Sequence, residues 1–411
     1  MSAYSKIQSM PPIIYDTQAR NLIQKLIKFF GFEVIEKRLK KYQNSLVYSG
    51  PISREYYLKN RHPWWEALTL FFEIEKSGKS LRKHLSPSLK RLIRDALMIS
   101  ELQRDIPLKV KSKFKKDLLD DDNASAYLFE LHTGWHFSRR GFEVIWYQED
   151  GKPEFCVKTQ TFSFDVECKR IGYDAARMIR RKDFYRFAEF LLPKIRRIQL
   201  KGQLDVVLNE RLHASEQYIK KLADEVLGTI ESSGPKGIFT VSQGEVVLNL
   251  VERQKTPVNF EEELNRIFNS KNFDGHTAIF AEKYDNSPVD PLILTMKSKK
   301  ASLVLTGIKN KIEEAAQKQL DSRKIGIITC FLETIGGNDL HELATESGLQ
   351  KMVSYVLEKE EHNHIAALIF CGEEEMVDSS NENEFSAKGL TFRNPNCPIE
   401  QVKDFPFLSS F

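Results

Sequence analysis

Residues 162–170, which read FSFDVECKR, carry charged side chains whose types and spacing would suit phosphodiester hydrolysis. In a strand, successive side chains point to opposite faces. One face would be apolar, and the other would present Ser163, Asp165, Glu167 and Lys169. Such a face can hold a divalent metal ion and an ammonium side by side. The same alternation is typical of any antiparallel strand with one solvated face, so this segment alone leaves both interpretations open.

Three further elements are expected immediately before this strand. Acidic residues at 120–123 (DDDN) favour the start of a helix over about residues 124–139. Aromatic and β-branched residues at 142–148 (FEVIWYQ) indicate a first strand. An Asp-Gly turn at 150–151 then leads into a second strand over 154–159. The predicted order is therefore helix, strand, strand, strand.

Each of these elements contributes to one pattern. The helix carries Glu130, the second strand opens with Pro153-Glu154, and the third strand has Glu167 two residues before Lys169. In these motifs and their order, the chain resembles the PD-(D/E)XK nuclease superfamily, which has the restriction-endonuclease-like fold. The helical glutamate matches one that many members carry. The resemblance makes these four charged residues the candidate catalytic residues.

The resemblance covers about residues 120–210 and implies a metal site. Hard divalent cations such as Mg²⁺ and Mn²⁺ take oxygen ligands. By resemblance, Glu154, Glu167 and the backbone carbonyl of Cys168 would bind the metal ion. The metal would lower the pKa of a bound water and offset charge on the scissile phosphate. Lys169 would orient or activate the attacking water.

The chain departs from the family at one acidic position. The family usually has Asp there, whereas here Pro153 is followed by Glu154. Asp165 points the same way as Glu167, one pleat earlier, and is the alternative second metal ligand. Strand rise separates these two residues by about 6 to 7 Å, which is far for a shared small ion. We therefore favour Glu154.

The segment after the third strand is strongly basic. Between Lys169 and Lys201 there are eleven Lys or Arg against three Asp or Glu. Such a block would attract a phosphate backbone and give salt-dependent binding. The alternative is the solvated face of an amphipathic helix. The residues expected to contact nucleic acid are Arg170, Arg180, Arg181, Lys182, Lys194 and Arg197.

The composition is that of an ordinary globular protein, with 41% hydrophobic and 29% charged residues and a net charge of +4. Five widely spaced cysteines without a CxxC pair indicate neither a disulfide framework nor a structural zinc, and fit a reducing compartment. His132 and His136 have no glutamate between them and are expected to be helix-surface or core residues rather than a zinc site. No signal peptide or membrane span is expected, which predicts a cytoplasmic protein that does not contact membranes.

The 411 residues are enough for two or three domains. We expect a mixed α/β protein with a helical region over 1–115, which includes an exposed basic run at 109–116 (KVKSKFKK). A restriction-endonuclease-like core, a central mixed sheet flanked by helices, would occupy 116–215 and take its next strand from 204–208. An α/β extension over 216–411 would follow and could continue that sheet.

Together these features predict a metal-dependent endonuclease that hydrolyses DNA with Mg²⁺ or Mn²⁺, with double-stranded DNA as its partner. By analogy, a large chain built around this core suggests restriction or phage defence, as a homodimer or with partner proteins. Two alternatives stay open. One is a catalytically silent nucleic-acid-binding or assembly module with the same fold. The other is a nuclease for RNA or branched DNA.

Overall fold

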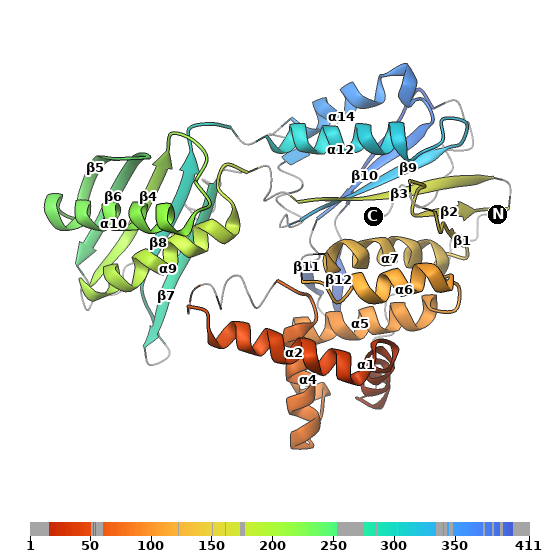
Figure 1. Ribbon diagram of the computed structural model, residues 1–411, viewed down its shortest axis with the longest axis horizontal. Helices are drawn as coiled ribbons and strands as arrows, with labels where there is room; N and C mark the ends of the chain where they lie inside the picture. The colour runs from red at the N-terminus through yellow and green to blue at the C-terminus, as the bar shows by residue number, and fades with distance from the viewer. Residues whose placement is uncertain are drawn as a thin grey trace. The chain divides into compact units, whose positions relative to one another are not determined.

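The computed structural model of the chain divides into two compact units (Figure 1). Unit 1 comprises Met1–Val47, Lys59–Tyr173 and Leu305–Phe411, and unit 2 comprises Tyr48–Leu58 and Asp174–Val304. The larger part of unit 2 is therefore an insertion in the sequence of unit 1. Within these ranges the structure describes residues 16–50, 52, 54, 61–121, 123–149, 151–160, 162–172, 177–252, 275–284, 287–301, 303–333, 340, 343–344, 348–372, 375–379, 382–386 and 389–397.

The N-terminal part of unit 1 is helical. Its elements are α1 (Asp16–Phe30), α2 (Phe32–Val47), α4 (Trp65–Ser77), the 3-10 turn η2 (Arg82–His84), α5 (Pro87–Leu102), α6 (Leu108–Asp117) and α7 (Ala124–Arg139). Ser86 caps α5, because its hydroxyl accepts a hydrogen bond from Leu89 N at 3.2 Å. Trp64 and Trp65 are both buried and belong to the core that these helices share with the sheet.

A six-stranded mixed sheet forms the centre of unit 1, so the fold is mixed α/β. The strand order is β1-β2-β3-β9-β10-β13. The first three strands are antiparallel, β3, β9 and β10 are parallel, and β13 is antiparallel to β10. A separate two-stranded hairpin consists of β11 (Glu375–Ser379) and β12 (Glu382–Ser386). The strands of the large sheet are β1 (Glu143–Trp146), β2 (Phe155–Lys158), β3 (Ser163–Ile171), β9 (Gly326–Leu332), β10 (Ile365–Cys371) and β13 (Gly389–Arg393).

Helices cover both faces of this sheet (Figure 1). On one face lies α7, whose Phe137 ring contacts Phe155 of β2 and Phe164 of β3, with centroids 6.2 and 5.7 Å apart. Gly134 permits this close approach, since a Cβ there would lie 2.6 Å from Trp146 of β1. On the other face lie α12 (Val304–Lys318) and α14 (Leu349–Leu357). Every residue of β10 is consequently buried.

Unit 2 has its own five-stranded sheet, in the order β5-β6-β4-β8-β7. Alternate residues of β4 (Leu204, Val206 and Leu208) are buried in a core that also includes apolar residues of the two helices. The elements are α9 (Arg181–Arg197), β4 (Leu200–Leu208), α10 (Glu216–Ser233), β5 (Lys236–Val241), β6 (Gly244–Glu252), β7 (Gly275–Tyr284) and β8 (Ser287–Ser298).

The strand expected at 204–208 does form, but it does not join the sheet of Glu167. It belongs to β4, which pairs with β6 and β8 inside unit 2. In unit 1 the strand beside β3 is instead β9, which lies in the C-terminal range 216–411. That range therefore does continue the sheet, through β9, β10 and β13. In the described part of the chain, no helix has the length and apolar character needed to cross a membrane.

Candidate active site

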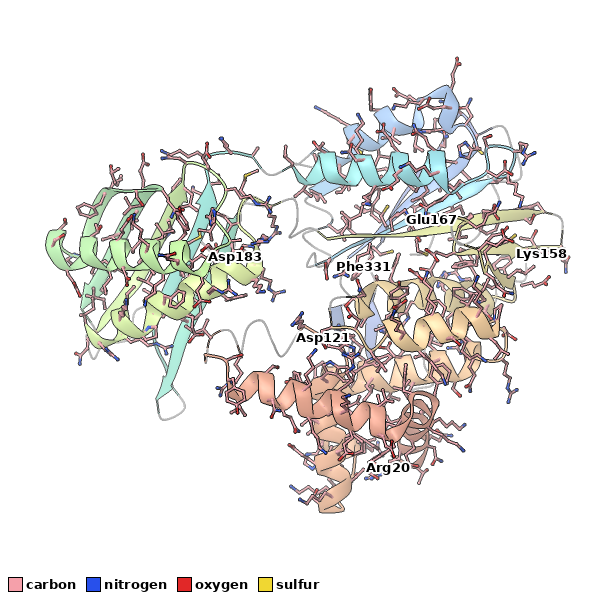
Figure 2. All side chains as sticks on the ribbon, viewed as in Figure 1. Arg20, Asp121, Lys158, Glu167, Asp183 and Phe331 are labelled. Atoms are coloured by element: carbon pink, nitrogen blue, oxygen red, sulfur yellow. The ribbon has the colours of Figure 1, made fainter. Side chains whose placement is uncertain are left out.

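Glu167 lies in the middle of β3, in the central sheet of unit 1 (Figure 2). Its side chain is completely buried, with 0% of its surface exposed. Lys169 Nζ forms an ion pair with Glu167 Oε1 at 2.6 Å. Neither Glu167 oxygen accepts a hydrogen bond of regular geometry from the described residues, and Oε2 has no charge partner among them either. Burial raises the pKa of Glu167 to about 7, the charge of Glu154 adds to this effect, and Lys169 opposes it. A buried carboxylate oxygen is thus left without the donor that such atoms normally have.

Glu154 is held next to β3 by its backbone. Its amide donates to Val166 O at 3.1 Å, and its carbonyl accepts from Tyr147 N at 3.1 Å. Regular pairing of β2 with β3 begins one residue later, at Phe155. Burial raises the pKa of Glu154, while the positive charges of Lys113 and Lys169 oppose that shift. Glu154 therefore shares one electrostatic environment with the Glu167–Lys169 pair.

Cys168 lies on the part of β3 that extends beyond the first residue of β2. The β2–β3 ladder stops at the pair Phe155–Val166, and among the described strands β9 alone pairs with β3 past that point. Val166 O points toward β2, because it accepts the bond from Glu154 N. Carbonyl directions alternate along a strand, so Cys168 O points the same way, beyond the end of the ladder. The Cys168 thiol is engaged separately, since Thr329 Oγ1 donates to Sγ at 3.1 Å.

Glu130 approaches from helix α7. The preceding residue, Phe129, stacks on Phe331 of β9 with ring centroids 5.4 Å apart, which fixes this turn of the helix against the sheet. Burial raises the pKa of Glu130 well above its ordinary value, and the negative charges of Glu154 and Glu167 raise it further. Three carboxylates from three elements are therefore close enough for their charges to interact.

Asp165, the alternative metal ligand, has partners of its own. Tyr147 donates its hydroxyl proton to Asp165 Oδ1 at 2.8 Å. Lys324 Nζ lies 3.8 Å from the other carboxylate oxygen. Both oxygens of this nearly buried side chain are thus engaged, in contrast to those of Glu167 two residues along. This arrangement favours Glu154 over Asp165 as the second ligand.

The six basic residues expected to bind nucleic acid are divided between the units. Arg170 lies in unit 1, at the end of β3, where its Nη2 is 2.5 Å from Glu333 Oε1. The other five lie in unit 2, on or just before α9. Arg180 pairs with Asp183 at 2.6 Å, and Lys194 forms an ion pair with Asp224. The Arg181 guanidinium lies over the Tyr185 ring, 5.8 Å from its centroid. The two of these six that are exposed rather than half-buried are Lys182 and Arg197.

A second lysine belongs to the carboxylate site, and sequence reasoning did not identify it. The positive charge of Lys113, on α6, lowers the pKa values of Glu130, Glu154 and Glu167 against the effect of burial. In the sequence it stands within the basic run 109–116, where nothing distinguishes it from its neighbours. Only the packing of α6 against α7 and β1 brings this lysine to the site.

The donor set fits a small divalent cation. No group of three or more His, Cys, Asp and Glu side chains in the described part of the chain is already arranged to hold a metal ion. Even so, the unpartnered Oε2 of Glu167, the carboxylate of Glu154 and the carbonyl of Cys168 are all hard oxygen donors. No protein-family model, no curated protein and no solved structure matches the chain.

Proposed function

We propose that this protein is a metal-dependent nuclease that hydrolyses phosphodiester bonds of DNA. The observation that carries the proposal is Glu167, a fully buried carboxylate with one oxygen in an ion pair with Lys169 and the other without a donor among the residues that the structure describes. Structural carboxylates at such depth are normally saturated with hydrogen bonds. Perturbed carboxylates that lie beside a specific charge partner are typical of functional sites.

The charges around Glu167 favour a divalent cation and then a phosphate. Glu130, Glu154 and Glu167 carry three negative charges when ionised, and Lys113 and Lys169 carry two positive charges. In that fully ionised state, which a bound cation favours over the protonated one, the cluster has a net charge of minus one. A divalent cation would change it to plus one, which suits a phosphodiester anion.

In the proposed mechanism Glu154, Glu167 and the carbonyl of Cys168 hold Mg²⁺ or Mn²⁺. The cation would offset charge on the scissile phosphate and lower the pKa of a coordinated water. Lys169 would orient the attacking water and stabilise negative charge on the phosphate. Its position beside Glu167 Oε1 supports this role. Glu130 would accept a hydrogen bond or a proton from a water molecule that lies between α7 and the sheet.

The arrangement of elements supports the resemblance to the PD-(D/E)XK superfamily. The elements follow one another in the order α7, β1, β2, β3, with Glu130 on α7, Glu154 directly before β2 and the Glu167–Lys169 pair on β3, which is the order expected of a restriction-endonuclease-like core. Double-stranded DNA as substrate, a role in restriction or phage defence, a cytoplasmic location and assembly as a homodimer or with partner proteins are further parts of the proposal. RNA and branched DNA are the alternative substrates.

A catalytically silent nucleic-acid-binding module is the competing function. The ion pair between Lys169 and Glu167 favours it, because that contact already neutralises one carboxylate without a metal ion. The two functions differ in their response to metal. A nuclease needs the cation, whereas a silent module would bind nucleic acid equally well in its absence.

Calorimetric titration with Mn²⁺ and incubation with plasmid DNA in Mg²⁺, Mn²⁺ or EDTA test the proposal. We expect the wild-type protein to bind Mn²⁺ and to cut plasmid only with a divalent cation. Lys169→Ala should keep the metal and lose the rate. Parallel incubations with single-stranded DNA, RNA and a branched duplex identify the substrate. A wild-type protein that binds no Mn²⁺ and leaves every substrate intact would refute the nuclease function.

A further inference from the structure

Lys113 contributes a positive charge to the carboxylate site but has no assigned role in the proposed cleavage step. It is exposed on α6, and no ion pair or hydrogen bond joins it to another described residue. Its ammonium lies over the ring of Tyr127, 5.6 Å from the centroid. Tyr127 precedes Glu130 on α7 by three residues, so the two side chains share one face of that helix. Lys113 is therefore presented next to Glu130.

Aromatic packing fixes this position of α6. Phe114, the residue after Lys113, is buried and contacts Trp146 of β1 and Tyr127 of α7, with ring centroids 5.5 and 6.0 Å apart. Trp146 in turn packs on Phe155 at 4.9 Å, directly after Glu154 in the chain. A continuous chain of rings thus joins α6 to β2, the strand that begins directly after Glu154. Lys113 is held beside the site by its neighbour rather than by a partner of its own.

We infer that Lys113 is a substrate-binding residue that contacts a non-scissile phosphate of the nucleic acid strand. Lys169 would act at the scissile phosphate, as proposed above. This inference rests on the proposed nuclease function. The Lys113 ammonium is exposed to solvent and its backbone is fixed by packing, so it can bind an anion. The Lys169 ammonium already forms an ion pair with Glu167. Lysine suits this task as a flexible point charge for phosphate oxygens.

The competing role is purely structural, with Lys113 acting only as a countercharge to the three carboxylates. Both roles predict that loss of the charge affects the carboxylates. Only the substrate-binding role predicts a weaker affinity for nucleic acid and a lower salt dependence of binding. The affinity for nucleic acid therefore separates the two roles.

The test is binding of a short DNA duplex in Ca²⁺ at several salt concentrations, using the full chain. Lys113→Gln should weaken binding about tenfold at low salt, and the salt slope should fall by about one, as for one lost phosphate contact. Lys113→Arg should restore most of the affinity. The matched control is Lys115→Gln, which removes the same charge from the same helix. The Lys115 ammonium lies over Phe29 of α1, 4.5 Å from the ring centre, and not over Tyr127 beside the carboxylate site.

Three results would overturn the inference: wild-type affinity in Lys113→Gln, an equal loss in Lys115→Gln, or no binding of the duplex by the wild-type protein. Thermal unfolding of each variant shows whether it is folded. The proposed function fails separately, if the wild-type protein neither binds Mn²⁺ nor cuts any substrate. A protein that cuts plasmid normally while Lys113→Gln binds like wild type would refute the role of Lys113 alone.

Discussion

Two carboxylates of unit 1 are equally deep in the protein and have opposite surroundings. Asp95, on α5, and Glu167, on β3, both have 0% exposure. Asp95 accepts hydrogen bonds from Trp64 Nε1 at 2.9 Å and Arg94 Nη2 at 3.1 Å, and its Oδ1 lies 2.9 Å from His132 Nε2. Glu167 has Lys169 at one oxygen, and within the described part of the chain no donor faces the other.

The two pKa values move apart for this reason. Burial alone would raise the pKa of Asp95, but the charge of Arg94 and the hydrogen bonds from His132 and Trp64 hold it well below its ordinary value. Glu167 has too few donors to offset burial, and its pKa rises. The difference teaches that depth alone does not mark a functional acid. The number of donors that the fold supplies separates an acid that stabilises the protein from one that is available to a ligand.

The largest expected effect is on cleavage. Glu167→Gln and Glu154→Gln should each abolish Mn²⁺ binding and lower the cleavage rate by about a thousandfold or more, because each removes a charged oxygen ligand. Asp165→Asn, on the same strand as Glu167, is the matched control and should cost only a few-fold in rate. Calorimetry and plasmid nicking measure both quantities. Metal binding that survives in Glu154→Gln but not in Asp165→Asn would reverse the ligand assignment.

The second effect is on stability and concerns the other acid. Asp95→Asn should lower the free energy of unfolding by about 3 kcal/mol, because it removes a charge on which Arg94 and His132 depend. Urea unfolding monitored by circular dichroism measures this change. The control is Glu313→Gln on α12, whose ion pair with Lys359 is near the surface and should contribute less than about 1 kcal/mol. If Asp95→Asn were as stable as the wild type, the charge of this fully hydrogen-bonded buried acid would contribute nothing to the free energy of unfolding.

The third effect is a dependence of stability on pH, with a definite sign. Glu167 has a folded-state pKa of about 7 against an ordinary value of 4.5. Its stabilising contribution is therefore complete below pH 4.5 and is lost as the pH rises through 7. The metal-free protein should lose about 2 kcal/mol of stability from this group between pH 5 and pH 8. Glu167→Gln should remove that loss, so that it is more stable than the wild type at pH 8 in EDTA. Parallel melting curves for the two proteins across this range would contradict the assignment.

The smallest effect concerns the basic helix of unit 2, where most charges are already paired. If α9 contacts phosphates, the exposed residues should matter more than the paired ones. Lys182→Ala combined with Arg197→Ala should lower the salt slope of DNA binding by about two. Lys194→Ala, which removes the ion pair with Asp224, should change the slope less. An unchanged slope in the double variant would leave α9 as a solvated helix face.

Local patterns of the sequence were informative about local structure. The alternation in FSFDVECKR does form a strand, β3, which carries Glu167. Glu154 lies directly before the neighbouring strand β2, one residue outside the strand expected to begin with it. His132, expected to be a surface or core residue, is held by Asp95. These features depend on residues that are close together in the chain. Periodicity and turn chemistry therefore carry enough information to predict them.

Features set by distant contacts could not be read in the same way. Residues 204–208 have a strand pattern, but nothing in that pattern says that β4 pairs with β6 and β8 rather than with β3. The partners of Asp165 include Lys324, which lies just before β9. Lys113 reaches the site only because an aromatic side chain next to it packs on β1. Each of these outcomes depends on the tertiary arrangement, which one sequence does not encode locally.

The insertion of unit 2 has a consequence for the order of events during synthesis. Glu167 pairs with Ile328 across the β3–β9 ladder, so the strand that completes its surroundings is translated only after the whole of unit 2. Folding of unit 2 can make the later pairing of β3 with β9 easier, because backbone hydrogen bonds tie its two ends into one sheet region. Leu212 N donates to Met178 O near the start of unit 2, and Lys299 N donates to Leu208 O near its end. Once folded, it brings the chain segments that follow β3 and precede α12 close together and lowers the entropy of closing the loop. In refolding monitored by hydrogen exchange, amides of unit 2 should therefore become protected before those of β3 and β9, and the reverse order would mean that the nascent sheet recruits β9 unaided.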